Sequence, residues 1–274
     1  MKKILLLAII FFPMVLLAQT NNYGNNKGGK YAPVRGLRMY YEEYGKGEPL
    51  LFIHGNGGSI VDFKGQIPYF AEKYRVIVAD SRAQGKSFDP RDSLSYEMMA
   101  DDHAALLSHL GIDSCRIVGW SDGGINALLL ALRHPEKVSS MAITGANLWP
   151  DTSAVDNEIH DMVMMMNDSL AKVPQTADIK AFRKLTRLLS YEPHIKTGQL
   201  SAIQCPVLVI GGDNDVIKPE HTLLIAKSIP RSYLWILPNS GHSTPVVYKD
   251  MFNAVVADFF AKPYKKFVGE DKFK

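Results

Sequence analysis

Residues 116–124 read Arg-Ile-Val-Gly-Trp-Ser-Asp-Gly-Gly, and this stretch decides the fold. It starts as a short apolar run, which is typical of a buried strand, and residues 124–132 continue with the apolar spacing of a helix. A strand that turns directly into a helix is the setting in which Gly-x-Ser-x-Gly presents its serine, here Ser121, as a nucleophile. Only small residues fit beside that serine, and Gly119 and Gly123 meet the demand. An ordinary glycine-rich turn is the plainer alternative.

Strands and helices alternate on both sides of this turn. Apolar runs predict strands at residues 39–44, 50–53, 74–79, 116–120, 138–143, 206–210 and 233–237, and helical spacing predicts helices at 96–110, 124–132, 220–228 and 246–260. The alternation predicts a largely parallel sheet with helices on both faces. Residues 148–203 contain no convincing strand and are too long for a simple crossover, so we expect an inserted helical cap there. Its methionines at 162, 165 and 166 favour either a helix packing face or an adaptable lid over apolar substrate.

A serine nucleophile needs a base within hydrogen-bond reach and an acid that orients the base. In this strand–helix setting the acid and then the histidine follow the serine along the chain. His242 comes just after the last predicted strand, and no other histidine follows a late strand. The acid is Asp213 or Asp215, because both lie in the turn after the strand at residues 206–210. We therefore expect a triad of Ser121, His242 and one of these two aspartates.

Acyl transfer also requires hydrogen-bond donors for the oxyanion. One is the backbone N–H of Asp122, which follows the serine. The other is expected from residues 54–58, His-Gly-Asn-Gly-Gly, in which Asn56 is the candidate donor. The plainer interpretation of this loop is a turn that ends a strand. We expect Trp120 and Asp122, which flank Ser121, to contact the substrate.

The composition is that of one globular domain. The chain has 274 residues, of which 46% are hydrophobic and 22% are charged. Its formal net charge of +3 does not indicate a nucleic-acid-binding surface. It has no Cys-x-x-Cys and no His-Glu-x-x-His, so no metal site is predicted, and the triad chemistry needs no cofactor. Cys115 and Cys205 each open an apolar run and are expected to be buried free thiols. Nothing in the sequence indicates an oligomeric state.

The two ends of the chain differ from its middle. Residues 1–18 have a positive start and an apolar run that ends at Ala18, shorter than the roughly 20 residues of a membrane span, and predict a cleaved secretory signal peptide. The mature protein would then be periplasmic or secreted, with no membrane span; an uncleaved anchor is the alternative. Residues 19–36 are expected to form a flexible leader, residues 37–262 the folded domain, and residues 263–274 a charged tail.

Five stretches together resemble the signature motifs of the α/β-hydrolase family, in the family's order and at family-like spacings over residues 35–261. They are His-Gly-Asn-Gly-Gly at 54–58, Asp-Ser-Arg-Ala-Gln-Gly-Lys-Ser at 80–87, Gly-Trp-Ser-Asp-Gly-Gly at 119–124, Gly-Asp-Asn-Asp at 212–215 and Gly-His at 241–242. The resemblance implies a mostly parallel eight-stranded sheet flanked by helices, with a small helical cap after strand six. It also implies that the triad acid is Asp215, the aspartate of Gly-x-x-Asp after strand seven. Cys115 and Cys205 would start strands five and seven, about 9.6 Å apart and too far for a disulfide.

The family resemblance also indicates a substrate class. A serine at this turn implies hydrolysis of an ester, thioester, amide or carbon–carbon bond. Residues 119–124 and His-Pro-Glu-Lys-Val at 134–138 are similar to valacyclovir-hydrolase-like (biphenyl-hydrolase-like) proteins, which cleave α-amino-acid esters. In them the aspartate beside the nucleophile, here Asp122, receives the substrate ammonium; in the plainer interpretation it only complements a helix N-terminus. We therefore expect a serine hydrolase acting on small-molecule carboxylic esters through an acyl-enzyme. An aminopeptidase or amidase on the same triad and a non-catalytic ligand-binding protein are the alternatives.

Overall fold

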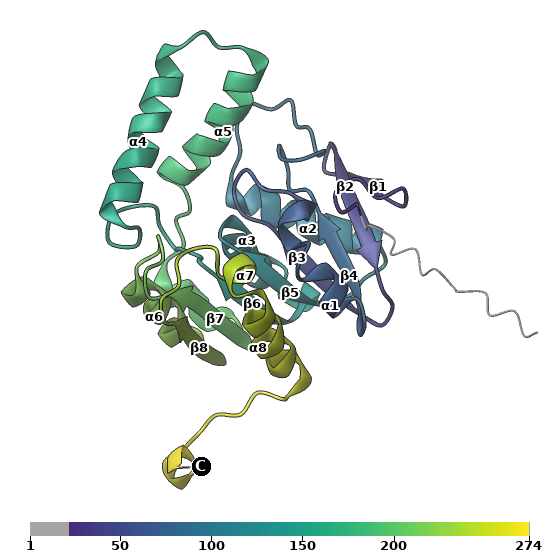
Figure 1. Cartoon of the computed structure of the whole chain (residues 1–274), viewed down its shortest axis with the longest axis vertical. Coiled ribbons are helices and arrows are strands. Elements are labelled where there is room, and N and C mark those ends of the chain that lie inside the picture. The colour runs from purple at the N-terminus through teal and green to yellow at the C-terminus, as the bar shows by residue number, and fades with distance from the viewer. Residues whose placement is uncertain (1–21, 274) are drawn as a thin grey trace, which may run out of the picture.

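The computed structural model describes residues 22–273, in which one sheet is covered by helices on both faces (Figure 1). The expected signal peptide, residues 1–18, lies outside the described residues. Within residues 22–273, no helix combines the length and the apolar character needed to cross a membrane.

Eight strands form this sheet in the order β1-β2-β4-β3-β5-β6-β7-β8. Only β2 runs against the direction of the others, so the mostly parallel eight-stranded sheet expected from the sequence is confirmed. The inner strands are buried on both faces, which explains why they read as continuous apolar runs. The strands are β1 (Lys30–Val34), β2 (Leu37–Tyr44), β3 (Glu48–Ile53), β4 (Tyr74–Ala79), β5 (Cys115–Trp120), β6 (Val138–Thr144), β7 (Val207–Gly212) and β8 (Ser232–Leu237).

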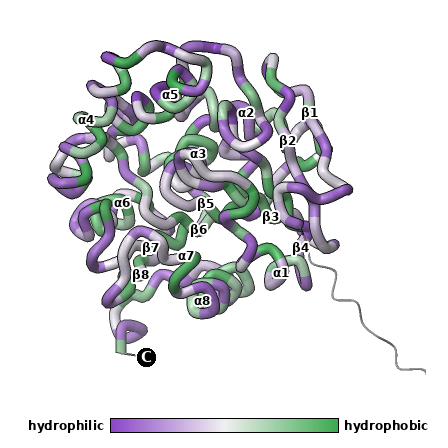
Figure 2. The backbone as a smooth tube through the Cα atoms, turned by 45° about the horizontal axis from the view of Figure 1, so that its top comes forward, coloured by the Kyte–Doolittle hydropathy of each residue, from purple (hydrophilic) through white to green (hydrophobic). Residues whose placement is uncertain are grey.

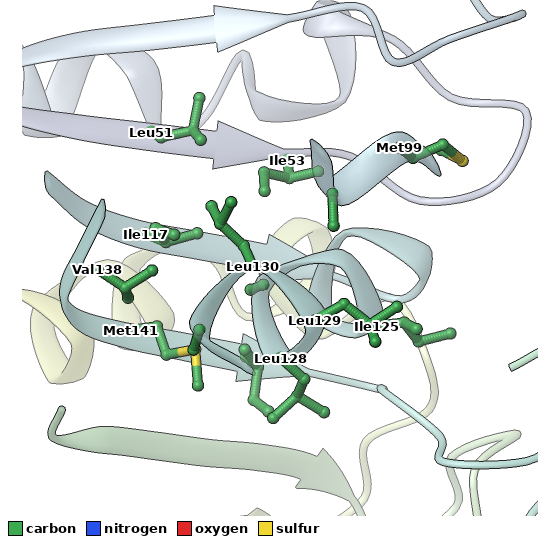
Figure 3. Packing of buried hydrophobic residues seen from close by; sticks show 14 of the residues in the cluster. Leu51, Ile53, Met99, Ile117, Ile125, Leu128, Leu129, Leu130, Val138 and Met141 are labelled. Atoms are coloured by element: carbon green, nitrogen blue, oxygen red, sulfur yellow. The ribbon is translucent and has the colours of Figure 1, made fainter. Parts of the chain in front are cut away.

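Two layers of helices enclose the sheet. The helices are α1 (Ile67–Phe70), α2 (Tyr96–His109), α3 (Asp122–Arg133), α4 (Asn157–Lys172), α5 (Ala177–Tyr191), α6 (Pro219–Ser228), α7 (Thr244–Val247) and α8 (Lys249–Ala261), with 3-10 turns at Ile60–Phe63, Pro135–Lys137, Thr197–Ala202 and Gly269–Phe273. Apolar side chains of α2, α3 and α6 pack on one face, and those of α1 and α8 on the other. Figure 3 shows Leu128 and Leu130 of α3 beside Met141 and Ile117 of the sheet, in the same buried cluster. Each such buried side chain contributes about 1.5–3 kcal/mol, and Figure 2 shows the hydrophobic residues gathered toward the centre.

The N-terminal leader differs from the sequence expectation. Residues 19–36 were expected to be flexible, but β1 lies within them and pairs antiparallel with β2. The short edge strand alternates, with Ala32 and Val34 buried and Pro33 exposed, a position that proline tolerates in an edge strand. The Arg35-Gly36 turn has positive φ at both residues, as a two-residue hairpin turn of type I′ requires. Glycine- and asparagine-rich composition obscured this hairpin.

The cap leaves the sheet between β6 and β7, where the insertion was expected. Its helices α4 and α5 pack against each other and project beyond the body of the molecule (Figure 1). Lys184 of α5 fastens the cap to the body, because its buried ammonium donates to the carbonyl oxygens of Asp89 (2.9 Å) and Arg91 (2.7 Å). The position of the cap above the carboxyl ends of the strands makes it one wall of the site described below.

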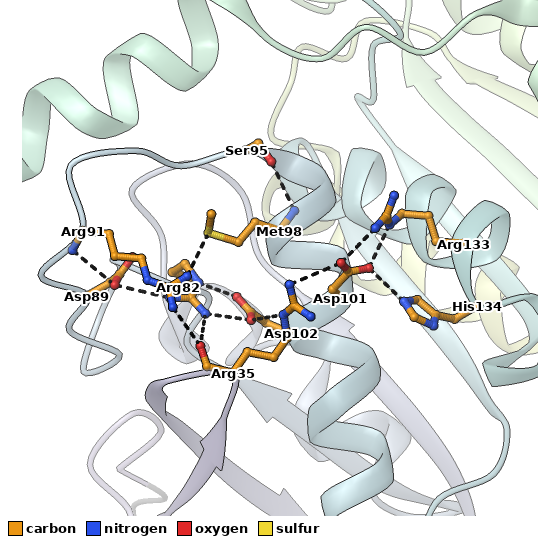
Figure 4. Close-up of polar contacts among 10 residues, drawn as sticks. All are labelled: Arg35, Arg82, Asp89, Arg91, Ser95, Met98, Asp101, Asp102, Arg133 and His134. Carbon is orange, nitrogen blue, oxygen red and sulfur yellow. Dashed lines mark hydrogen bonds and ion pairs between the residues drawn. The ribbon is translucent and has the colours of Figure 1, made fainter.

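A buried ion network holds the loop that follows β4. Arg82 is fully buried and binds Asp102 of α2 in a two-point interaction, at 2.5 Å from Nε and 2.7 Å from Nη2 (Figure 4). Its Nη1 lies 3.3 Å from Asp89, and its Nη2 also donates to the carbonyl oxygen of Arg35. One guanidinium therefore neutralises two buried carboxylates.

We expect Arg82→Met to lower the free energy of unfolding by about 3–5 kcal/mol, because it breaks two buried ion pairs. Asp102 then keeps only the half-exposed Arg35 at 3.3 Å, and Asp89 only Lys184 at 4.0 Å. Urea unfolding monitored by circular dichroism measures the change. The matched control is Arg133→Met, which removes the half-exposed pair with Asp101 (Figure 4) and is expected to cost no more than about 1 kcal/mol. Equal losses in the two variants would contradict the role given to burial.

Candidate active site

The turn between β5 and α3 places Ser121 in a strained conformation. Its φ of 56° and ψ of −120° lie where side chains rarely occur, and its N–H donates to the carbonyl oxygen of Thr144 at 2.8 Å. A Cβ on Gly119 would stand 2.3 Å from the carbonyl oxygen of Gly123, and one on Gly123 would stand 1.8 Å from that of Ile53. Only glycine can occupy these two positions, which explains the spacing seen in the sequence.

The structure brings Ser121, His242 and Asp215 together from three separate loops. The Ser121 hydroxyl lies 2.9 Å from Nε2 of His242, and Nδ1 of His242 lies 2.6 Å from Oδ1 of Asp215. The Asp215 side chain is fully buried, and its two oxygens also accept the N–H groups of Ile217 (3.1 Å) and Gly212 (3.4 Å). With Nδ1–H donating to this carboxylate, Nε2 is left to accept the serine proton.

Asp213 faces away from the histidine ring. Its carboxylate accepts the N–H groups of Asn239 (2.9 Å) and Ser240 (3.0 Å), and these hydrogen bonds lower its pKa. It therefore ties the turn after β7 to the loop that carries His242. Of the two aspartates that the sequence left open, only Asp215 contacts the imidazole.

The loop after β3 passes directly beside the serine. A Cβ on Gly55 would lie 3.1 Å from Cβ of Ser121, so a glycine keeps the loop at this distance. The N–H of Asn56 donates to no atom of residues 22–273, and the N–H of Asp122 stands at the first position of α3, where no acceptor exists within the helix. Both expected oxyanion donors therefore lie next to Ser121. The Asn56 side chain instead donates to Oδ2 of Asp122 (2.9 Å) and to the cap at the carbonyl oxygen of Leu185 (3.3 Å).

A cavity of about 330 Å³ lies between the serine and the cap. Its floor holds Ser121, His242, Asn56, Asp122 and Trp120, so every expected site residue except the buried Asp215 lines it. Trp120 also donates its indole N–H to the carbonyl oxygen of His242 at 2.9 Å, which fixes the backbone of the base. The cap and the loop after β7 supply an apolar wall. Its residues are Val155, Ile159, Met162, Val163, Met166 and Leu189 from the cap and Val216 and Ile217 from that loop. Met162 and Met166 line the cavity, as the lid interpretation of the cap methionines predicts. Met165 is exposed, so it does not support the interpretation of these methionines as a packing face.

Asp122 carries the unusual electrostatics of the site. The residue is 1% exposed, and burial raises the pKa of its carboxyl group to about 6. Hydrogen bonds from the Tyr96 hydroxyl and the Asn56 amide favour the ionised form and oppose part of that rise. No lysine or arginine within residues 22–273 pairs with it. At neutral pH the cavity therefore presents a buried carboxylate without a counter-charge.

Sequence reasoning missed three residues of the site. Tyr96 starts α2 far from the motifs, and its hydroxyl donates to Asp122. Gly145 has a φ of 63°, and a Cβ there would stand 2.6 Å from Cε1 of His242, so it leaves space for the imidazole. Glu192 follows α5 and lines the cavity. Only Gly145, a glycine directly after a strand, left a signal that could have been noticed.

Within residues 22–273, no cluster of three or more histidine, cysteine or acidic side chains is placed to hold a metal ion. Cys115 and Cys205 are both free thiols. Cys115 starts β5 and Cys205 precedes β7, and β6 lies between these two strands. The cavity is thus lined by a hydroxyl and an imidazole that are hydrogen-bonded to each other, and a buried carboxylate holds the far side of the imidazole.

Several known proteins resemble this chain in sequence and in fold. The sequence profile of the alpha/beta hydrolase fold matches residues 48–167. A 2-hydroxymuconate semialdehyde hydrolase of Pseudomonas sp. (strain CF600) is 30% identical over 271 residues, which cover 85% of this chain and 94% of that protein. The serine hydrolase BPHL of Mus musculus is 29% identical, over 82% of this chain and 84% of its own length. The solved structure of Est816, described as an N-acyl homoserine lactone degrading enzyme, is 26% identical with a TM-score of 0.68, and the match covers 82% of this chain and 98% of Est816.

Proposed function

We propose that this chain, which belongs to the α/β-hydrolase family and is a hydrolase, cleaves small carboxylic esters that carry a free α-amino group. The observation that carries the proposal is that one cavity is lined both by Ser121 and His242, which are hydrogen-bonded in series to the buried Asp215, and by the uncompensated carboxylate of Asp122. The three hydrogen-bonded residues support acyl transfer, and the carboxylate of Asp122 supports binding of a cationic substrate.

The reaction proceeds through an acyl-enzyme. His242 Nε2 takes the proton of the Ser121 hydroxyl while Oγ attacks the acyl carbon. The N–H groups of Asn56 and Asp122 bind the oxyanion that develops, and Asp215 orients His242 and stabilises its cationic form. When the carbon–oxygen bond breaks, His242 returns its proton to the leaving alkoxide. Water then attacks the acyl-enzyme by the same steps, which releases the acid and restores Ser121.

The lining of the cavity supports the substrate class. Its charged residues are carboxylates and histidines, with no lysine or arginine, so it favours cationic over anionic substrates. The nitrogen of an α-ammonium lies two bonds from the acyl carbon, and Asp122 directly follows the nucleophile in the chain. The apolar wall of the cap suits an apolar leaving group.

A panel of matched substrates tests the proposal. Wild-type protein is assayed on L-valine benzyl ester, on isovalerate benzyl ester, which lacks the amine, and on L-valine amides. Faster turnover of the amino-acid ester supports it. Preferential cleavage of the amides would favour the aminopeptidase or amidase alternative. Absence of all turnover, with saturable ligand binding, would favour a non-catalytic binding protein.

We expect Asp122→Asn to lower kcat/KM for the amino-acid ester by about 10- to 100-fold and to leave the ester without an amine nearly unchanged. In the wild type, the ratio of the two kcat/KM values should fall as pH decreases through about 6. Protonation below that pH neutralises Asp122, while the substrate amine, with a pKa of roughly 7.7, stays charged. Titration of the triad affects both substrates and cancels in the ratio. A ratio that does not change with pH, or that still changes in the variant, would count against an ammonium site at Asp122.

A further inference from the structure

A second acidic side chain in the cavity is left unused by the proposed reaction. Glu192 stands directly after α5, at the base of the cap, and lines the cavity together with Tyr96 and Asp122. Its side chain makes no hydrogen bond or ion pair with the described part of the chain. Arg187 borders a separate hollow with Glu192 but forms no ion pair with it, and Lys184 is held by the carbonyl oxygens of Asp89 and Arg91.

The surroundings of Glu192 make its negative charge unfavourable in the empty cavity. Partial burial raises the pKa of its carboxyl group, the charge of Glu97 raises it further, and only His194 opposes the change. Tyr96 lies within the field of both Asp122 and Glu192, and both charges help to raise the pKa of its phenol. Three carboxylates line the cavity, and no lysine or arginine does. Asp62 accepts the N–H of Ser59, which leaves Asp122 and Glu192 as the acidic pair. A ligand that brings positive charge to both would remove this cost.

We propose that Glu192 binds a second cationic group of the substrate, at the end of the acyl side chain, so that the preferred substrates are esters of amino acids with basic side chains. This inference rests on the proposed function, in which Asp122 holds the α-ammonium. With the acyl carbon at Ser121 and the α-ammonium at Asp122, the remaining substituent on the α-carbon is the side chain. The apolar residues of α4 in the cavity serve the alcohol part of the ester, and Glu192, which lines the same cavity, is available to the side chain.

The test compares L-lysine benzyl ester with L-norleucine benzyl ester, which has the same four-carbon chain without the ammonium. We expect wild-type kcat/KM to be at least about 10-fold higher for the lysine ester, as a charge-assisted interaction provides. Glu192→Gln should remove this preference, so that its kcat/KM values for the two esters become similar. The matched control is Glu97→Gln, which removes a neighbouring carboxylate that does not line the cavity and should preserve the preference.

Each outcome decides the inference. Equal or better use of the norleucine ester by the wild type overturns it, as does an equal loss of preference in Glu192→Gln and Glu97→Gln. If the wild type cleaves both esters through Ser121 but does not prefer the lysine ester, only this inference fails. If it cleaves neither ester, the proposed function fails as well. Inhibition of the wild type by L-lysine amide and L-norleucine amide needs no variant: at least about 10-fold tighter inhibition by the lysine amide supports the inference, and equal inhibition overturns it.

Discussion

Replacement of Ser121 by alanine is expected to lower kcat for ester hydrolysis by about 10⁵- to 10⁶-fold. The hydroxyl is the only group that the proposed reaction uses as a nucleophile, and it lies 2.9 Å from the base. Without it, His242, Asp215 and the oxyanion donors remain in place but have no bond to form with the acyl carbon. The residual rate then reflects only binding and oxyanion stabilisation, which in triad enzymes still exceed water by about 10³- to 10⁴-fold.

The experiment is steady-state hydrolysis of L-valine benzyl ester by wild type and Ser121→Ala. The hydroxyl of Ser121 caps no helix, so the variant should unfold at nearly the same temperature as the wild type. Ser228→Ala is the matched control, since its hydroxyl donates only to the carbonyl oxygen of Leu224 within α6. A Ser121→Ala protein that keeps more than roughly a tenth of the wild-type kcat would exclude this serine as the nucleophile.

Asp215→Asn is expected to lower kcat by about 10⁴-fold with little change in the structure. The carboxylate accepts the Nδ1–H of His242 at 2.6 Å, and this leaves Nε2 free to take the serine proton. An amide that donates to Nδ1 instead would hold the ring in the other tautomer, with its hydrogen on Nε2, where it cannot act as a base. The loss should appear in kcat far more than in KM, because Asp215 does not line the cavity.

Asp213→Asn separates this role from the simple loss of a negative charge nearby. Asp213 binds only N–H groups of the neighbouring turn and an adjacent amide, so its replacement should lower kcat by less than about tenfold. If the two variants lost kcat equally, the acid could not be assigned to Asp215. Comparison of the two variants therefore tests the identity of the triad acid, for which the sequence motifs left two candidates.

Much of the fold and the site can be predicted from local sequence patterns. The central strands are apolar throughout because both faces of the sheet are covered, and the tight turn at Ser121 requires glycines at fixed positions. Parallel strands end at one edge of the sheet, so residues that follow three strands, Ser121, Asp215 and His242, had to meet there. Such features depend on residues close together in the sequence, and the sequence therefore records them.

Local patterns failed where a residue acts through distant partners. The edge strand β1 was hidden by its composition, because its stability comes from pairing with β2 and not from its own propensity. The choice between Asp213 and Asp215 depended on which carboxylate turns toward the His242 ring. Two aspartates that are only two residues apart do not reveal this in the sequence.

The sequence by itself determined the sheet, the position of the nucleophile and the histidine, and the place of the cap. Only the tertiary structure decided that Asp122 is buried without a counter-charge, that Tyr96 donates to it, and that Glu192 joins it in the cavity. These three residues come from α3, α2 and the end of α5, which are far apart in the chain. Burial and electric field at a point are sums over every element packed around it, so they are set by the completed fold and not by any one stretch of sequence.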